Sequence, residues 1–133
     1  MQVLENFNLE LDSLSNLFQE NIEYLRDTDK KIFIYGAQDT AKRKYDLISS
    51  LGKDVEAFFV DDKYYVPNQK INGKNVYSKA YVLNKYNDFV VVIGFYEYAK
   101  YLDVLKSNVF SQSIRLLFFY ESPQTPSTVC CGY

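Results

Sequence analysis

The sequence predicts an α/β domain: an open, mostly parallel sheet with helices on both faces, preceded by an N-terminal amphipathic helix. Two observations predict it. Apolar strand-like runs alternate with helix-like segments along the chain, which is typical of sheets with helical crossovers. The strand-like runs are apolar throughout, as expected of strands that helices cover on both faces. The architecture is therefore Rossmann-like, in a chain whose 133 residues suffice for one domain.

The N-terminal helix is predicted from about Asp12 to Arg26. Its apolar stripe has the three-and-four spacing of an amphipathic helix and consists of Leu11, Leu14, Phe18, Ile22 and Leu25. Because both faces of the sheet already have candidate helices, we expect this helix to cover the sheet edge or to join a homodimer.

The first half of the sheet comes from a βαβ unit. A buried strand at Lys31–Tyr35 leads through the turn Gly36–Asp39 into a helix at about Thr40–Leu51, which Gly52 ends. A second apolar strand follows at Val55–Val60. Such a crossover places its two strands parallel.

The second half repeats the alternation. An Asn-Gly pair predicts a short hairpin or edge strand in Ile71–Val76, and a serine caps a short helix over Ser78–Lys85. The strand Phe89–Ile93 forms the sheet centre beside the first strand, and the last strand is Ile114–Phe119. Between them a helix at about Glu97–Ser107 is expected to turn four residues inward: Tyr98, Tyr101, Leu102 and Leu105.

These elements divide the chain into three parts. Residues 1–30 form the helix and a linker, residues 31–120 the Rossmann-like domain, and residues 121–133 a tail with Ser, Pro and Thr. The adjacent Cys130 and Cys131 cannot provide a spaced metal site or a disulfide framework, which fits a reducing compartment.

Composition excludes several classes of function. The formal net charge is −2 with no visible basic face, so we expect no nucleic-acid partner. The sequence has no histidine, which excludes His-based triads and His-ligated zinc within this chain. No apolar run approaches the roughly 18 residues of a spanning helix, so we expect no membrane span and a cytoplasmic protein.

The turn after the first strand carries the main functional motif. The run Gly36–Ala41 aligns with the dinucleotide fingerprint G-x-G-x-x-G/A, and Asp61 follows at the end of the next strand. Gly36 would permit the tight turn, Ala41 would let the helix pack close, and Asp61 would accept hydrogen bonds from ribose hydroxyls. Gln38 occupies the second glycine position, where a side chain would obstruct the pyrophosphate. The candidate cofactor-binding residues are Gly36, Ala37, Gln38, Asp39, Thr40, Arg43, Asp61 and Gly94.

Each of these signals has a structural alternative. The turn can be a strand-to-helix connection that binds nothing, and Asp61-Asp62 can be a turn pair that bonds backbone amides. The basic run Lys42-Arg43-Lys44 at the helix start indicates either a nearby phosphate or a solvated face.

Tyrosines add two weaker signals. Four of them fall on the predicted ligand side and could stack on a base or sugar: Tyr64, Tyr65, Tyr96 and Tyr98. Tyr81 and Lys85 have the Tyr-x-x-x-Lys spacing of some NAD-dependent enzymes, with only Ser78 as a neighbouring serine, so chance explains the spacing better.

Several segments together resemble the Rossmann-like N-terminal domain found in FkbM-type methyltransferases and PglD-type sugar O-acyltransferases. The segments are Lys31–Ala37, Ala57–Asp62, Ile71–Tyr77 and Val90–Gly94. The resemblance implies a nucleotide or nucleotide-sugar pocket lined by Gly36, Ala37 and Asp61, with Arg43 near the helix start. It departs at Gln38, and we expect the chain to act without the catalytic domain of those families.

The leading hypothesis is thus a domain that binds a nucleotide or nucleotide-sugar and serves glycan or polysaccharide modification without completing a reaction. We expect no catalytic residue and no metal site in this chain. The alternative is an interaction or dimerisation module that has lost ligand binding and pairs with a second copy or a separate catalytic chain.

Overall fold

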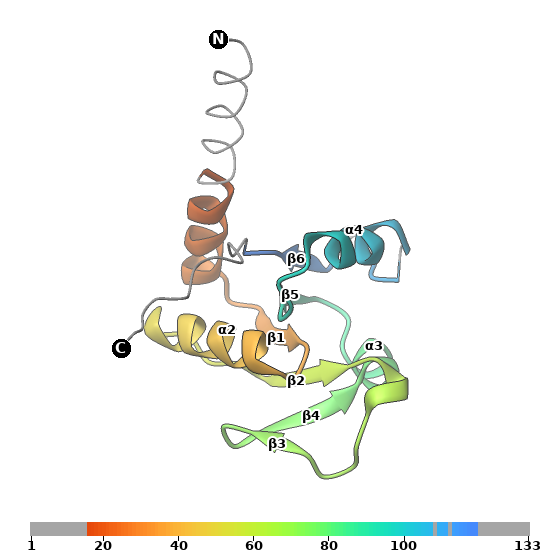
Figure 1. The fold of residues 1–133 in the computed structure, drawn as a ribbon. Helices are drawn as coiled ribbons and strands as arrows, with labels where there is room; N and C mark the ends of the chain where they lie inside the picture. The colour runs from red at the N-terminus through yellow and green to blue at the C-terminus, as the bar shows by residue number, and fades with distance from the viewer. Residues whose placement is uncertain (1–15, 108, 112, 120–133) are drawn as a thin grey trace, which may run out of the picture.

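The fold is a six-stranded sheet with helices on both faces (Figure 1), seen in a computed structural model that describes residues 16–107, 109–111 and 113–119. The strands are β1 (Lys31–Tyr35), β2 (Ala57–Val60), β3 (Lys70–Ile71), β4 (Lys74–Ser78), β5 (Phe89–Ile93) and β6 (Arg115–Leu117). The helices are the N-terminal helix (16–27), α2 (Asp39–Ser50), α3 (Lys79–Lys85) and α4 (Tyr98–Ser107), with a 3₁₀ turn at Asp62–Tyr64.

The strand order is β3-β4-β2-β1-β5-β6, and every pairing except that of β3 with β4 is parallel. Tyr35, the last residue of β1, lies opposite Phe59 of β2 and Ile93 of β5. The predicted centre, formed by β1 and β5 with β2 and β6 beside them, is therefore confirmed. A right-handed crossover through α2 accounts for the parallel β1–β2 pair.

Alternate residues of the strands build two separate cores, one on each face. Ile32 and Ile34 of β1 point to the face covered by the N-terminal helix and α2. Phe33 and Tyr35 point to the other face, which α3 and α4 cover. Burial on both faces explains why these strands are apolar at every position.

The N-terminal helix packs on one face of the sheet beside α2, over the β6 end. Leu25 is fully buried, Phe18 meets Phe119 edge to face at 5.4 Å, and the Asn21 side chain donates to the carbonyl of Phe118 at 3.0 Å. The predicted helices of both faces are present, since α2 packs on one face and α3 and α4 pack on the other. The N-terminal helix lies on the α2 face, against residues that follow the edge strand β6. Residues 12–15 of the predicted helix lie outside the described residues, and dimer formation stays a prediction.

The predicted hairpin is present, but it reaches further than the sequence indicated. Asn72 and Gly73 both have positive φ values, 51° and 79°, which match a two-residue primed turn. β4 then continues to Ser78 and pairs in parallel with β2, so the hairpin joins the main sheet. The Ser78 hydroxyl accepts a bond from the Tyr81 amide and caps α3 as predicted.

Other boundaries shift by a few residues. Val55 and Phe119 are buried but lie outside β2 and β6. The inward placement of Tyr98 and Leu105 was wrong: their exposed fractions are 52% and 43%, and α4 has no buried residue. The predicted tail from residue 121, with its two cysteines, lies outside the described residues.

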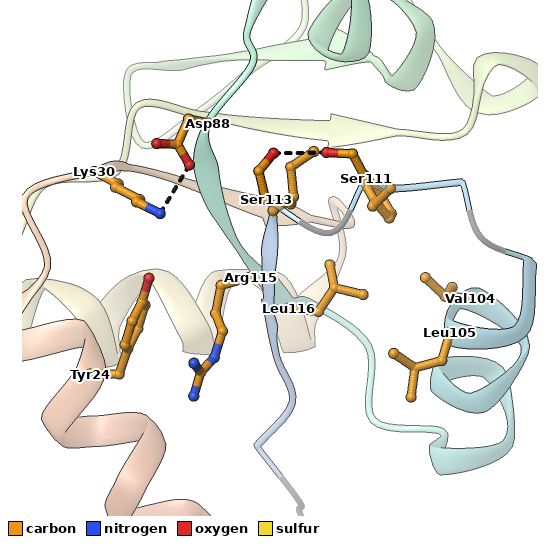
Figure 2. Close-up of a pocket in the computed structure, with 11 residues that line it drawn as sticks. Tyr24, Lys30, Asp88, Val104, Leu105, Ser111, Ser113, Arg115 and Leu116 are labelled. Carbon is orange, nitrogen blue, oxygen red and sulfur yellow. Dashed lines mark hydrogen bonds and ion pairs between the residues drawn. The ribbon is translucent and has the colours of Figure 1, made fainter.

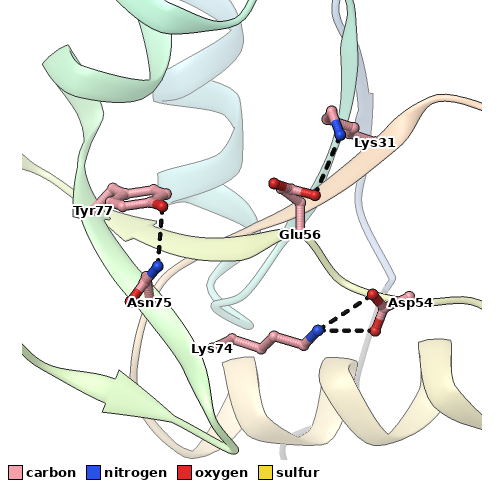
Figure 3. A network of polar contacts seen from close by, with 6 residues as sticks. All are labelled: Lys31, Asp54, Glu56, Lys74, Asn75 and Tyr77. Atoms are coloured by element: carbon pink, nitrogen blue, oxygen red, sulfur yellow. Dashed lines mark hydrogen bonds and ion pairs between the residues drawn. The ribbon is translucent and has the colours of Figure 1, made fainter.

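Polar contacts tie the amino ends of three strands together (Figure 3). Lys31 at the start of β1 pairs with Glu56 at 3.5 Å, and Lys74 at the start of β4 pairs with Asp54 at 3.0 Å. Both pairs are solvent-exposed, so each contributes little to stability. The candidate site lies at the opposite end of the sheet, where the strands have their carboxyl ends.

Candidate functional site

The candidate site lies where the strand order reverses. From β1 the chain proceeds to β2 and β4 on one side, and then returns to β5 and β6 on the other. The carboxyl ends of β1 and β5 therefore form a topological switch point, the usual ligand position in open α/β sheets. Gly36 follows β1 there, and Gly94 follows β5.

The two glycines are in such close contact that neither position has room for a side chain. Gly36 has φ +135°, and a Cβ built on it would lie 2.9 Å from the Gly94 carbonyl oxygen. A Cβ on Gly94 would meet the Tyr35 carbonyl at 2.8 Å and the Ala41 Cβ at 3.0 Å. Backbone bonds fix the turn, because the Gly36 amide donates to Phe59 and the Gly94 amide to Tyr35, each at 2.8 Å. The predicted roles of Gly36 and Ala41 are confirmed.

The first turn of α2 opens directly from this contact. Gln38 is the N-cap residue, is exposed, and makes no side-chain capping bond. Asp39 is exposed in the first turn, whereas Thr40 is buried and its hydroxyl accepts a bond from the Arg43 guanidinium at 2.9 Å. Ala37 packs against the core. The sequence-predicted turn residues thus come together at the switch point, with Gln38 and Asp39 facing solvent.

The basic residues at the start of α2 do not all lie on one solvent-exposed face of the helix. Lys42 is exposed, but Lys44 is only 4% exposed and its ammonium lies 6.0 Å from the centre of the Phe119 ring. A fully solvated basic face is therefore wrong for Lys44, whose stem packs inward while its charge lies near an aromatic ring.

Asp61 belongs to a polar cluster with two residues that the sequence did not single out. Its Oδ1 atom accepts a short hydrogen bond from the Tyr35 hydroxyl and pairs with the Lys79 ammonium at 3.3 Å. The Asp61 side chain is 31% exposed. Tyr35 ends β1, Asp61 follows β2 and Lys79 follows β4, so three adjacent strands supply the cluster.

The cluster shifts the protonation of both acids. Burial acts to raise the pKa of Asp61, but the Tyr35 hydroxyl and the Lys79 ammonium outweigh it and hold that pKa below the ordinary 3.8. Burial, together with the Asp61 carboxylate, raises the pKa of Tyr35 well above its usual value. At neutral pH Asp61 is therefore a carboxylate and Tyr35 a neutral phenol.

We expect Asp61 to titrate below pH 3.8 in an NMR titration of its carboxyl carbon, and Lys79→Met to move the midpoint upward. Because the folded pKa lies below the unfolded one, the stability that this cluster contributes is complete at neutral pH and is lost as the pH falls through the folded pKa. Lys42→Met removes an exposed charge that is not among the groups acting on the Asp61 pKa, and should leave the midpoint in place. A wild-type midpoint above 3.8 would contradict the arrangement.

Asp62 bonds a backbone amide, which is the structural role considered for it. Its Oδ1 atom accepts a bond from the Ala80 amide at 3.0 Å, which ties the turn after β2 to the start of α3. The predicted tyrosines on the ligand side are exposed, Tyr64 at 62% and Tyr96 at 48%. Tyr81 and Lys85 bond directly at 2.9 Å on α3.

Within the described part of the chain, no three His, Cys, Asp or Glu side chains gather as metal ligands. None of the helices described there is long and apolar enough to cross a membrane. No protein-family model, curated protein or solved structure matches this sequence. The function proposed below is therefore based on the fold and on the geometry of the switch point.

Proposed function

We propose that this domain binds a nucleotide or nucleotide-sugar at the carboxyl ends of β1 and β5 and does not itself catalyse a reaction. The observation that supports the proposal most is the position of the α2 N-terminus. The Gly36 turn places it at the switch point, and Gln38 leaves its first amides without a side-chain cap. Helix amides in that position favour anionic groups such as phosphates.

The Asp61 cluster supplies a second contact for such a ligand. Both of its contacts with Tyr35 and Lys79 use Oδ1, which leaves Oδ2 to accept a bond from a ribose or sugar hydroxyl. Lys79 places a positive charge beside it, which suits a ligand that carries phosphate. Asp61 is thus held in place before the ligand arrives rather than standing alone at the strand end.

The resemblance to N-terminal domains of FkbM-type methyltransferases and PglD-type acyltransferases favours a nucleotide-sugar among the possible ligands. It also favours a role in glycan or polysaccharide modification, with the reaction performed by another domain or chain. Tyr81 and Lys85, which bond to each other on the exposed side of α3, have no part in the proposed site.

The second candidate function is a protein-interaction module. The observation in its favour is the exposure of large apolar side chains, which usually marks an interaction surface when they gather. Among the described residues the most exposed of these are Tyr64, Val66, Tyr98, Tyr96, Leu105, Leu17 and Phe18.

Replacing Gln38 with glycine is expected to tighten binding of UDP by about threefold to tenfold, because it opens the helix N-terminus to phosphate. Calorimetric titration with UDP, UDP-glucose and NAD measures the effect. Gln38→Leu keeps the side-chain volume and should bind as the wild type does. Tight NAD binding by the wild type would contradict the obstruction by Gln38. If neither the wild type nor either variant binds any of the three ligands, the interaction module replaces the proposal.

A further inference from the structure

A concave surface lies at the other end of the sheet from the switch point, around the amino ends of β5 and β6 (Figure 2). Its volume is about 630 Å³, within the usual range of binding pockets. It includes neither Gly36 nor Gly94, because those follow the carboxyl ends of their strands. No motif in the sequence predicted this pocket.

The floor of this pocket is an open sheet edge. Among the described residues, β6 pairs with β5 on one side and with no strand on the other. The Asn21 side chain closes the carboxyl end of this edge by bonding the Phe118 carbonyl. The stretch that lines the pocket is Ser113–Leu116, which comprises the two residues before β6 and the first two residues of β6, Arg115 and Leu116. Unpaired edges of this kind can accept another extended chain.

One side of the edge is cationic. Figure 2 shows Arg115 leaving β6 toward Tyr24, and its guanidinium lies 4.5 Å from the centre of the Tyr24 ring. Lys30 lies on the same side and pairs with Asp88 at 2.9 Å. Arg115 is exposed and has no carboxylate partner in the described ranges. On this side, the Tyr24 ring holds a guanidinium whose positive charge is not paired with a carboxylate of the described residues.

The other side is apolar. Leu116 leaves β6 in the opposite direction from Arg115, toward Val104 and Leu105 of α4 (Figure 2). Leu105 is 43% exposed although it faces the pocket. Consecutive residues of β6 therefore meet two different environments, one on each side of the strand.

We propose that the open edge of β6 binds an extended segment of another polypeptide in which acidic and apolar residues alternate. An extended chain that runs along β6 can meet both sides of the pocket. The side chains of an added strand point alternately to the two sides. Its acidic residues would then meet Arg115, and its apolar residues would meet Leu105 and Leu116. A protein that carries such a segment is docked away from the nucleotide site.

The probe is a fluorescein-labelled peptide of alternating Glu and Val, with its binding to the full chain followed by fluorescence polarisation. We expect saturable binding that is lost when alternate peptide amides are N-methylated, because the strand pairing needs them. A block peptide of the same composition, with all Glu preceding all Val, should bind about tenfold more weakly. Equal binding of all three peptides would overturn the proposal.

Two variants locate the contact. Arg115→Glu should weaken binding of the Glu-Val peptide by about tenfold and favour a Lys-Val peptide instead. Leu105→Asp alters the exposed apolar side and should also weaken binding. Lys42→Glu makes the same charge change on α2 and should leave binding unchanged. An Arg115→Glu protein that is folded by circular dichroism yet binds like wild type would overturn the proposal, as would a wild-type dimer that this variant dissociates.

Discussion

Replacing Gly36 with alanine is expected to lower the free energy of unfolding by about 3 kcal/mol, through backbone strain and overpacking together. The φ of +135° disfavours any side chain, and the new Cβ would lie 2.9 Å from the carbonyl oxygen of Gly94. Neither group can move easily, because the Gly36 and Gly94 amides are both bonded to neighbouring strands. Urea denaturation at neutral pH measures the effect.

Gly52 provides the matched control. It also has a positive φ, +79°, but a Cβ there would meet nothing within 4 Å. Gly52→Ala should therefore cost only the conformational strain, about 1 kcal/mol. If the two variants are equally stable, the close approach at the switch point does not constrain the fold.

Replacing Asp61 with alanine is expected to weaken UDP or UDP-glucose binding by about 1–3 kcal/mol, roughly fivefold to 150-fold. The carboxylate is held by Tyr35 and Lys79 and would present Oδ2 to a ligand hydroxyl. The variant loses this acceptor and also leaves the Lys79 charge without its partner. Calorimetric titration of protein shown to be folded by circular dichroism checks the prediction.

Two variants separate the ligand contact from the structural one. Tyr35→Phe removes the hydroxyl that bonds Asp61 but keeps the carboxylate and Lys79, so it should lower stability and retain most of the affinity. Asp62→Ala removes the bond to the Ala80 amide and should behave similarly. If either variant loses as much affinity as Asp61→Ala, the effect is a general one on the strand ends.

Local sequence patterns were sufficient for most elements of the fold. β1 and β5 have the predicted bounds because short, unbroken β-branched and aromatic runs are typical of strands buried on both faces. The Ser78 cap and the Asn72-Gly73 turn were predictable because each depends on the chemistry of one or two residues.

Long-range pairing was not predictable in the same way. Nothing local to Lys74–Ser78 shows that β4 pairs with β2, so Lys79 could not be placed beside Asp61. Tyr35 looked like a core residue, and only the sheet order brings its hydroxyl to the end of β2. The burial of Lys44 depends likewise on Phe119, which lies far away in the sequence.

The motif at Gly36–Ala41 predicted the local backbone geometry after β1. The tight turn and the close helix follow from glycine at one position and alanine at another, and the structure has both. The pocket beside β6 could not be predicted from any local motif, because it depends on the strand order, in which β6 is the last strand.

An amide NMR titration of the labelled protein with UDP tests the central claim most directly. Nucleotide binding at the switch point predicts saturable shifts of the Gly36, Gln38, Asp39 and Gly94 amides, which follow β1 and β5, with little change at Arg115 and Leu116 on β6. No shifts at millimolar UDP, or shifts confined to the β6 edge, would contradict it.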